Sequence, residues 1–281
     1  MQIRVSTLNQ VVQTCEAMRK RSLHVHTSSW RTYCAKGYFE KATFHGRSIV
    51  TLMEMFRSNK QPLDIAGVCV LSRCILEVHN AATYLLEFGL SKAESELRYY
   101  LFRLNRSSDL KKINNGFGIK DIDDRNSFNA VAIERLHHEL HSNPIFQALD
   151  EPHRKSLLKG KSPYLSARYT GKKPVPRSIE SAAYNLFSHN VHSFSLGLSP
   201  MYEGCATPAG GANRCFLAIE LATIYMSNIA LLYWRLRSKA IKMLTDEERD
   251  ALIKGASTAY LENWLSDLQS NNMPSSLYPA Y

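Results

Sequence analysis

The chain has 281 residues, of which 44% are hydrophobic and 21% are charged, so it is long enough to bury a full core and lies outside the disordered and fibrous classes. Lys and Arg number 35 against 25 Asp and Glu, which gives a formal net charge of +10. This excess favours nucleic acid or another acidic partner, although basic proteins that touch no nucleic acid also occur.

Apolar residues recur at helical spacing throughout the chain, without a convincing alternating strand pattern. Pro62 and Gly89 bound one helix, and capping boxes begin at Ser91 and Thr245. The sequence therefore predicts an all-α, multi-helix bundle of about eight or nine helices. The expected helices cover 6–25, 40–59, 62–88, 91–107, 124–141, 145–159, 178–197, 213–240 and 246–270. Residues 1–60 are expected to form an N-terminal helical extension, and residues 61–281 a bundle domain that carries a polar site.

The six cysteines include no CxxC pair, and the N-terminus lacks the continuous apolar run of a signal peptide. Free thiols and a cytosolic location are expected. Residues 215–234 are apolar enough to suggest a membrane span, but Glu220 and Asn228 lie inside this run. A central core helix is therefore predicted there, and no membrane association.

The helix predicted at 62–88 carries a polar stripe opposite its apolar face. Arg73, Glu77, Asn80 and Tyr84 follow one another at steps of four, three and four. Apolar residues flank the stripe, with Phe88 below it, so the helix is expected to be buried nearly all round. A buried Arg and Glu must be paired, and each is the other's nearest partner. A plain intrahelical ion pair is the alternative interpretation.

The segment YNLFSHNVH places Tyr184, Ser188 and His192 on one helical face. Two hydroxyls and an imidazole could satisfy the stripe's remaining donors and acceptors. We therefore expect this helix to face the stripe, where a Glu beside a His would suit acid–base chemistry.

The segment from 161 to 177 is a basic loop with interleaved tyrosines and no acidic residue. Such a loop suits a phosphate backbone with bases stacked on aromatic rings. An exposed basic loop with two docking tyrosines is the alternative. Its predicted nucleic-acid-binding residues are Lys161, Tyr164, Arg168, Tyr169, Lys172, Lys173 and Arg177.

No phosphate-binding glycine loop and no nucleophile elbow is present. Glu134, His137 and His141 share a helical face and could form a metal-binding wall, but a solvated histidine-rich helix explains them better. The sequence predicts no metal and no cofactor.

The two polar helices resemble those of a family of uncharacterised bacterial helical proteins. That family pairs an R-x3-E-x2-N helix, as at Arg73, with a later Y-x3-S-x3-H helix, as at Tyr184. The intervening SKAESELRYYLFRLNRSSDLKK, with Arg98, resembles its second helix. The resemblance spans about residues 60–240 and implies a site without implying a reaction.

The chain also resembles HEPN ribonucleases, helical bundles that dimerise and cut RNA without metal. Their signature, an Arg followed by four to six residues and a His, matches residues 73–79 and also 19–24, 21–26 and 135–141. Arg73 and His79 lie about a third of a turn from a common face, which departs from ideal convergence.

The resemblance implies a toxin or phage-defence endoribonuclease that acts as a homodimer or with a partner protein. An imidazole of His79 or His192 would take a proton from a ribose hydroxyl while Arg73 steadied the phosphate. The candidate catalytic residues are Arg73, Glu77, His79, Asn80, Tyr184, Ser188 and His192. The alternative is a non-catalytic helical subunit that binds protein or nucleic acid.

Overall fold

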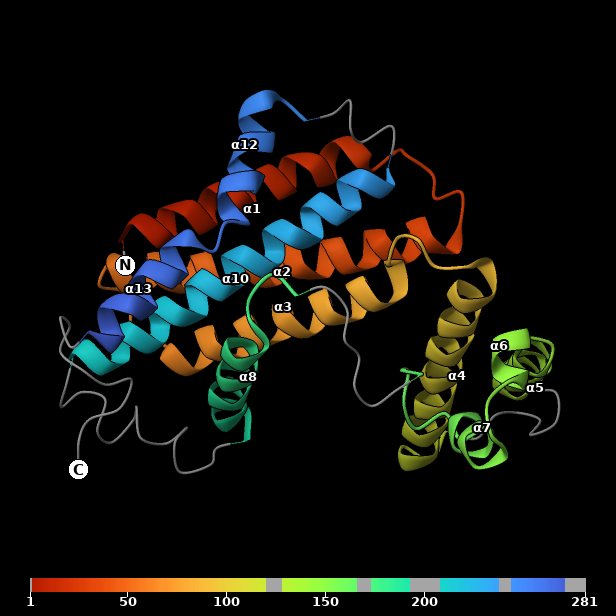
Figure 1. Ribbon diagram of the computed structural model, residues 1–281. Coiled ribbons are helices and arrows are strands. Elements are labelled where there is room, and N and C mark those ends of the chain that lie inside the picture. Colours follow the sequence, from red (N-terminus) through yellow and green to blue (C-terminus); the bar gives the residue numbers. More distant parts are fainter. Residues whose placement is uncertain (1, 120–127, 166–172, 193–207, 238–243, 271–281) are drawn as a thin grey trace. The chain divides into compact units, whose positions relative to one another are not determined.

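The computed structural model describes residues 2–119, 128–165, 173–192, 208–237 and 244–270 (Figure 1). Every regular element within these ranges is a helix, so the predicted all-α fold is confirmed. The chain divides into two compact units. Unit 1 contains Met1–Ala82 and Lys172–Tyr281, and unit 2 contains Thr83–Gly171.

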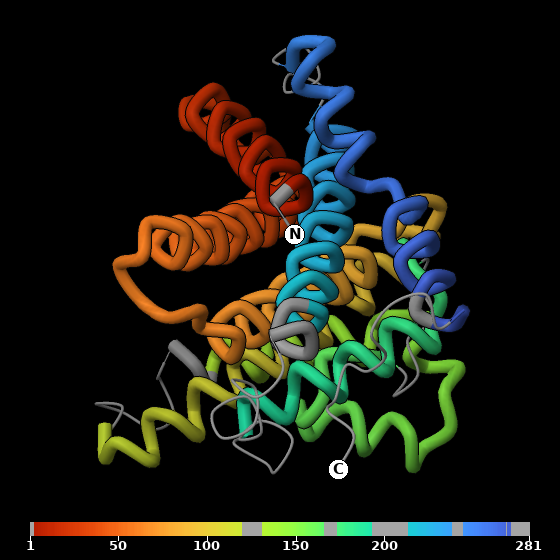
Figure 2. Tube along the Cα trace, turned by 90° about the vertical axis from the view of Figure 1, so that its left-hand side faces the viewer, coloured from red at the N-terminus to blue at the C-terminus, as the bar shows by residue number. Residues whose placement is uncertain are grey.

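Unit 1 holds most of the long helices. They are α1 (Gln2–Ser22), α2 (Trp30–Arg57), most of α3 (Ile65–Leu86), α8 (Arg177–His192), α10 (Pro208–Leu236), α12 (Asp246–Gly255) and α13 (Ala259–Gln269). Helix α10 packs against α1, α2 and α12 (Figures 1 and 2). Its Tyr233 ring stacks on Phe39 of α2, with centroids 4.4 Å apart. Gly46 permits close approach, because an added Cβ would lie only 2.5 Å from the sulfur of Met226.

Unit 2 is built around α4 (Lys92–Gly116), which packs against α5 (Phe128–His141) and the short α6 (Pro144–Gln147). Helix α7 (Glu151–Leu158) completes it. Its core contains Leu97, Leu101, Leu104, Leu136, Leu140, Phe146 and Leu157.

This division differs from the one expected at residue 60. Leu8, Val11, Val12 and Cys15 of α1 are fully buried, because the apolar face of α1 packs against α2 and α10. The first 60 residues are thus part of the unit 1 core, and the boundary between the units falls inside α3.

Some predicted helices break where the turn chemistry requires it. The segment at 246–270 divides into α12 and α13, and the one at 145–159 into α6 and α7, where Asp150 caps α7. Thr245 forms a complete capping box with Glu248. Ser91 accepts from the Glu94 amide at 3.1 Å, but the Glu94 carboxylate binds Arg98.

Two helices are long and apolar enough to cross a membrane, by length and composition only. They lie at Ile65–Leu86 and Asn213–Leu236, and their most apolar stretches are 44% and 83% buried inside the protein. The high burial of α10 agrees with the predicted core helix, since core helices pass the same compositional test.

The described cysteines are free thiols, and Cys15, Cys69 and Cys215 pack in the core as small hydrophobic residues. Burial raises the pKa of the Cys69 and Cys215 thiols to about 12, so both stay protonated.

One ion pair lies inside the apolar core. Arg4 of α1 binds Glu220 of α10, and the side chains are 6% and 0% exposed. The Arg4 guanidinium also lies 4.7 Å from the ring centre of Tyr260. Burial raises the pKa of Glu220 despite the bond from Arg4. The pair therefore joins α1 to α10 through two desolvated charges.

Removing one member of this pair should be costly. We expect Arg4→Met to lower the free energy of unfolding by about 3 kcal/mol, because Glu220 loses its counter-charge. The double variant Arg4→Met with Glu220→Leu should recover most of the loss. Arg47→Met is the control, since Arg47 and its partner Glu16 are 38% and 29% exposed, and should cost less than about 1 kcal/mol. Urea unfolding followed by circular dichroism measures all three, and equal losses for both single variants would contradict the expectation.

Candidate functional site

Helices α3 and α8 meet through Arg73 and Tyr184, as the sequence predicted. Arg73 donates to the Tyr184 hydroxyl at 2.9 Å, and its guanidinium lies 4.6 Å from the centre of that ring. Arg73 also donates to Glu77 at 3.0 Å, and the Tyr184 hydroxyl donates to the same carboxylate at 3.3 Å. Arg73, Glu77 and Tyr184 thus form a triangle of contacts, although Arg73 and Tyr184 lie 111 positions apart in the chain.

A second group of contacts lies one turn farther along, centred on Glu180. Asn80 donates to Glu180 Oε1 at 3.2 Å, and the Lys173 ammonium donates to the same oxygen at 2.9 Å. Lys173 also donates to Asn80 Oδ1 at 2.5 Å. The Tyr225 hydroxyl of α10 donates to Glu180 Oε2 at 2.6 Å. We call Asn80, Lys173, Glu180 and Tyr225 the Glu180 cluster.

The Glu180 carboxylate is ionised in this cluster. Burial alone would raise its pKa, but the donors Tyr225, Lys173 and Asn80 outweigh burial and hold the pKa below its usual value. Burial and the adjacent carboxylate both raise the pKa of the Tyr225 hydroxyl, which remains a donor. The cluster is an ion pair in which both oxygens of the Glu180 carboxylate are bonded, so this carboxylate is not poised to take up a proton.

His79 is buried, with 3% of its surface exposed, and its ring lies edge-on to Tyr225 with centroids 4.8 Å apart. Burial, followed by the charge of Lys173, lowers its pKa to about 4, so the imidazole is neutral near pH 7. Arg73 and His79 therefore make different contacts. Arg73 belongs to the partly exposed triangle, whereas His79 is buried in the core. The HEPN-type spacing does not bring these two side chains together, because six residues turn a helix well past one face.

The other two residues of the Tyr184 face behave differently from Tyr184 itself. The Ser188 hydroxyl donates to the backbone carbonyl of Tyr184 at 2.6 Å, within its own helix. His192 is exposed at the end of α8. It lies eight residues, about 12 Å of helix, beyond Tyr184. Ser188 and His192 are therefore not drawn into the triangle with Arg73.

The stripe on α3 is less buried than the sequence suggested. The Glu77 side chain is 48% exposed and that of Arg73 is 15% exposed. Phe88, which was expected to cover the stripe from below, is 55% exposed. The triangle thus stands at the surface, and only the Glu180 cluster and His79 lie deeper.

The predicted basic loop includes Arg168, Tyr169 and Lys172, which lie outside the described residues. Lys161 and Arg177 are exposed, as a phosphate-binding role requires. Lys173, which was predicted to bind a phosphate, is engaged within the protein instead. Its ammonium is bound by Asn80 and Glu180, and its side chain is only 18% exposed. A lysine held by a buried carboxylate neutralises that charge instead of a phosphate.

Tyr164 of the same loop packs inside unit 2. Its ring lies edge-on to Tyr84, with centroids 5.0 Å apart. The Tyr84 hydroxyl accepts from the Leu165 amide at 2.8 Å. This is the docking role that the sequence left open as the alternative to base stacking.

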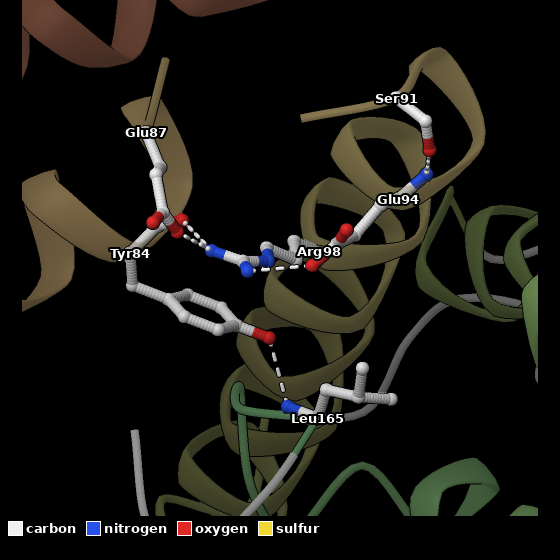
Figure 3. Close-up of polar contacts among 6 residues, drawn as sticks. All are labelled: Tyr84, Glu87, Ser91, Glu94, Arg98 and Leu165. Atoms are coloured by element: carbon white, nitrogen blue, oxygen red, sulfur yellow. Dashed lines mark hydrogen bonds and ion pairs between the residues drawn. The ribbon is translucent and has the colours of Figure 1, made fainter. Parts of the chain in front are cut away.

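Arg98 organises the contacts around Tyr84 (Figure 3). Its Nη1 donates to Glu87 and to the Tyr84 carbonyl, both at 2.7 Å, and its Nη2 donates to Glu94 at 2.6 Å. The guanidinium also lies 4.6 Å from the centre of the Tyr84 ring. Tyr84 thus belongs to unit 2, whereas the first three stripe residues belong to unit 1.

Within the described ranges, no three His, Cys, Asp or Glu side chains lie close enough to hold a metal ion. Of the histidine-rich face on α5, Glu134 and His141 are exposed, and the His141 ring packs edge-on to Phe146 at 5.6 Å.

Glu180 and Tyr225 were missed by the sequence analysis. Glu180 does carry a signal, because it lies four residues before Tyr184 and extends the same face by one turn. Tyr225 carries none, since it lies within an apolar run where a tyrosine ordinarily packs as a hydrophobic residue.

No protein-family model, curated protein or solved structure was found to match this chain.

The contacts of the Glu180 cluster should contribute to the free energy of unfolding. We expect Glu180→Gln to lower the free energy of unfolding by about 3 kcal/mol, because Lys173 keeps a poorly solvated charge without its partner. Glu77→Gln is the matched control and should cost less than about 1 kcal/mol, since Glu77 is half exposed. Urea unfolding compares the two, and a larger loss at Glu77 would show that the cluster is not the stronger contact.

The neutral His79 predicts a pH dependence. An unfolded His takes up a proton near its ordinary pKa of 6.5, whereas folded His79 does so only at about 4. The unfolded chain therefore binds more protons between these values, and stability falls as the pH is lowered through this window, by about 3 kcal/mol. His79→Phe should remove this part of the slope. Thermal melts at several pH values measure it, and an unchanged slope would contradict the assignment.

Proposed function

We propose that this chain is a helical nucleic-acid-binding protein in which the polar residues of α3 and α8 serve structure and not catalysis. The division of charge supports this most directly. Arg73 is paired with Glu77, and Lys173 with Glu180, so these four groups contribute no net charge. The net charge of +10 is carried by the rest of the chain. Exposed lysines, among them Lys20, Lys41, Lys60 and Lys161, supply part of it.

An exposed lysine can neutralise a phosphate without being held in a fixed position, whereas a catalytic group must be held in place beside the reacting atoms. A HEPN-type reaction would require an arginine and an uncharged, accessible imidazole near one phosphate. Buried His79 cannot reach a phosphate while α3 stays packed. Exposed His192 lies about two helical turns beyond Tyr184, the residue of α8 that binds Arg73. The binding subunit is thus better supported than the ribonuclease.

Binding should depend steeply on salt. With about four phosphates contacted, the logarithm of the association constant should fall with the logarithm of salt concentration at a slope of about −3 on single-stranded RNA. Fluorescence anisotropy with a labelled RNA measures it. Absence of RNA and DNA binding at low salt would refute the proposal.

The same RNA should stay intact during incubation with the protein, and Arg73→Ala and His192→Ala should leave both its length and its binding unchanged. Gel electrophoresis follows the length, and circular dichroism verifies that the variants fold. Cleavage by the wild type that either variant abolishes would instead favour the HEPN-type ribonuclease.

A further inference from the structure

The first 60 residues carry a large net positive charge. Residues 1–60 hold ten Lys and Arg (positions 4, 19, 20, 21, 31, 36, 41, 47, 57 and 60) against three Asp and Glu (positions 16, 40 and 54). That difference is seven of the ten net positive charges. Glu16 is bound by Arg47 through two bonds, at 2.9 and 2.5 Å, so these two charges cancel and leave the difference unchanged. Arg4 and Arg21 are paired with Glu220 and Glu248, which lie outside these 60 residues. Helices α1 and α2 therefore carry a large net positive charge.

The outer face of α2 adds exposed aromatic rings to this charge. Tyr33, Gly37, Lys41 and Phe44 follow at steps of four, four and three, so they share one face of the helix. Tyr33 and Phe44 are 66% and 56% exposed, and Lys41 is exposed between them. A Cβ added at Gly37 would meet no atom within 4 Å, so the surface between the rings is open. The rings stand about 16 Å apart along the helix axis.

Arginines accompany the aromatic rings. The Arg19 guanidinium of α1 lies 5.6 Å from the centre of the Phe44 ring, and that of Arg31 lies 5.9 Å from Trp30. In Figure 2, α1 (red) and α2 (orange) lie side by side, in agreement with their contacts. Cations next to accessible rings are the combination that holds single strands, because bases stack on rings while phosphates meet the charges.

Other partners fit this face less well. A membrane-bound helix presents a continuous band of large apolar side chains, whereas here glycine and lysine separate two rings. Base pairs within a duplex keep their faces stacked on one another and would leave Tyr33 and Phe44 without a partner. Unpaired bases expose flat apolar faces, and their backbone carries the complementary charge.

We propose that the outer face of α2, formed by Tyr33, Lys41 and Phe44 together with Arg19 of α1, binds single-stranded nucleic acid. The inference rests on the proposed function and names its site and its class of ligand. The phosphates are neutralised by Arg19 and Lys41, and bases stack on Tyr33 and Phe44.

Matched substitutions in the two units test the proposal. Phe44→Ala should weaken binding of a fluorescein-labelled oligouridylate by about tenfold, and Tyr33→Ala by a similar factor. Lys41→Gln should make the salt dependence shallower by about 0.7 in slope. Lys111→Gln on α4 and Phe117→Ala at the C-cap of α4 are the controls in unit 2. Phe117 is 78% exposed and Lys111 is also exposed, but neither lies on α1 or α2, so both variants should bind as the wild type does.

A perfectly paired hairpin of similar length distinguishes stacking from charge alone. It should bind more weakly than the oligouridylate, and Phe44→Ala should change its affinity little. If the wild type binds RNA but the α2 variants match it, the site is wrong and the proposed function survives. If Phe44→Ala weakens hairpin and single strand equally, the preference for single strands is wrong. If the wild type binds neither of these RNAs nor DNA at low salt, the proposed function itself fails.

Discussion

The arrangement around α8 depends on one desolvated negative charge, the carboxylate of Glu180. It can remain ionised only while donors surround it, and these come from three places in the sequence: Asn80 on α3, Lys173 ahead of α8, and Tyr225 on α10. An ionic contact of this kind tolerates little displacement, since each bond is lost within about an ångström. The cluster therefore fixes the register of α8 against α3. The triangle of Arg73, Glu77 and Tyr184, one turn away, follows from that register.

Helix α10 carries two such contacts within a mostly apolar surface. Glu220 binds Arg4 and so orients α1, while Tyr225 binds Glu180 and so orients α8. Apolar packing is non-directional and would allow either neighbour to slide or rotate at modest cost. A buried polar contact penalises such shifts, because each leaves a charge without a partner. On this view, the polar residues that interrupt the hydrophobic run of α10 select one packing among several similar ones.

Helical periodicity was enough to predict the all-α fold and the stripe on α3, and it placed Tyr184, Ser188 and His192 on one face. The meeting of that face with the stripe was inferred from complementary donors and acceptors, and of the three residues Tyr184 contacts Arg73. Periodicity could not show which side of α3 is buried, because apolar residues flank the stripe on both sides. In the structure Glu77 is exposed and His79 is buried. Nor could it find the partners of Glu180, because Tyr225 is 45 residues away and Asn80 is 100 residues away. Lys173 looked like part of a basic loop, and only the fold brings a buried carboxylate to it. Such long-range pairings depend on tertiary geometry, which no local spacing encodes.

The way the charges are distributed connects stability with the proposed role. Two ion pairs of the interior, Arg4 with Glu220 and Lys173 with Glu180, add nothing to the external field. The surface of α1 and α2, by contrast, gathers cations of one sign, and their mutual repulsion opposes folding. The buried apolar faces of α1 and α2, which pack against α10, act against that repulsion. Under the proposed function, a polyanion bound there would reduce the repulsion, and its binding would stabilise unit 1 to the extent that the folded surface holds it more tightly than the unfolded chain does.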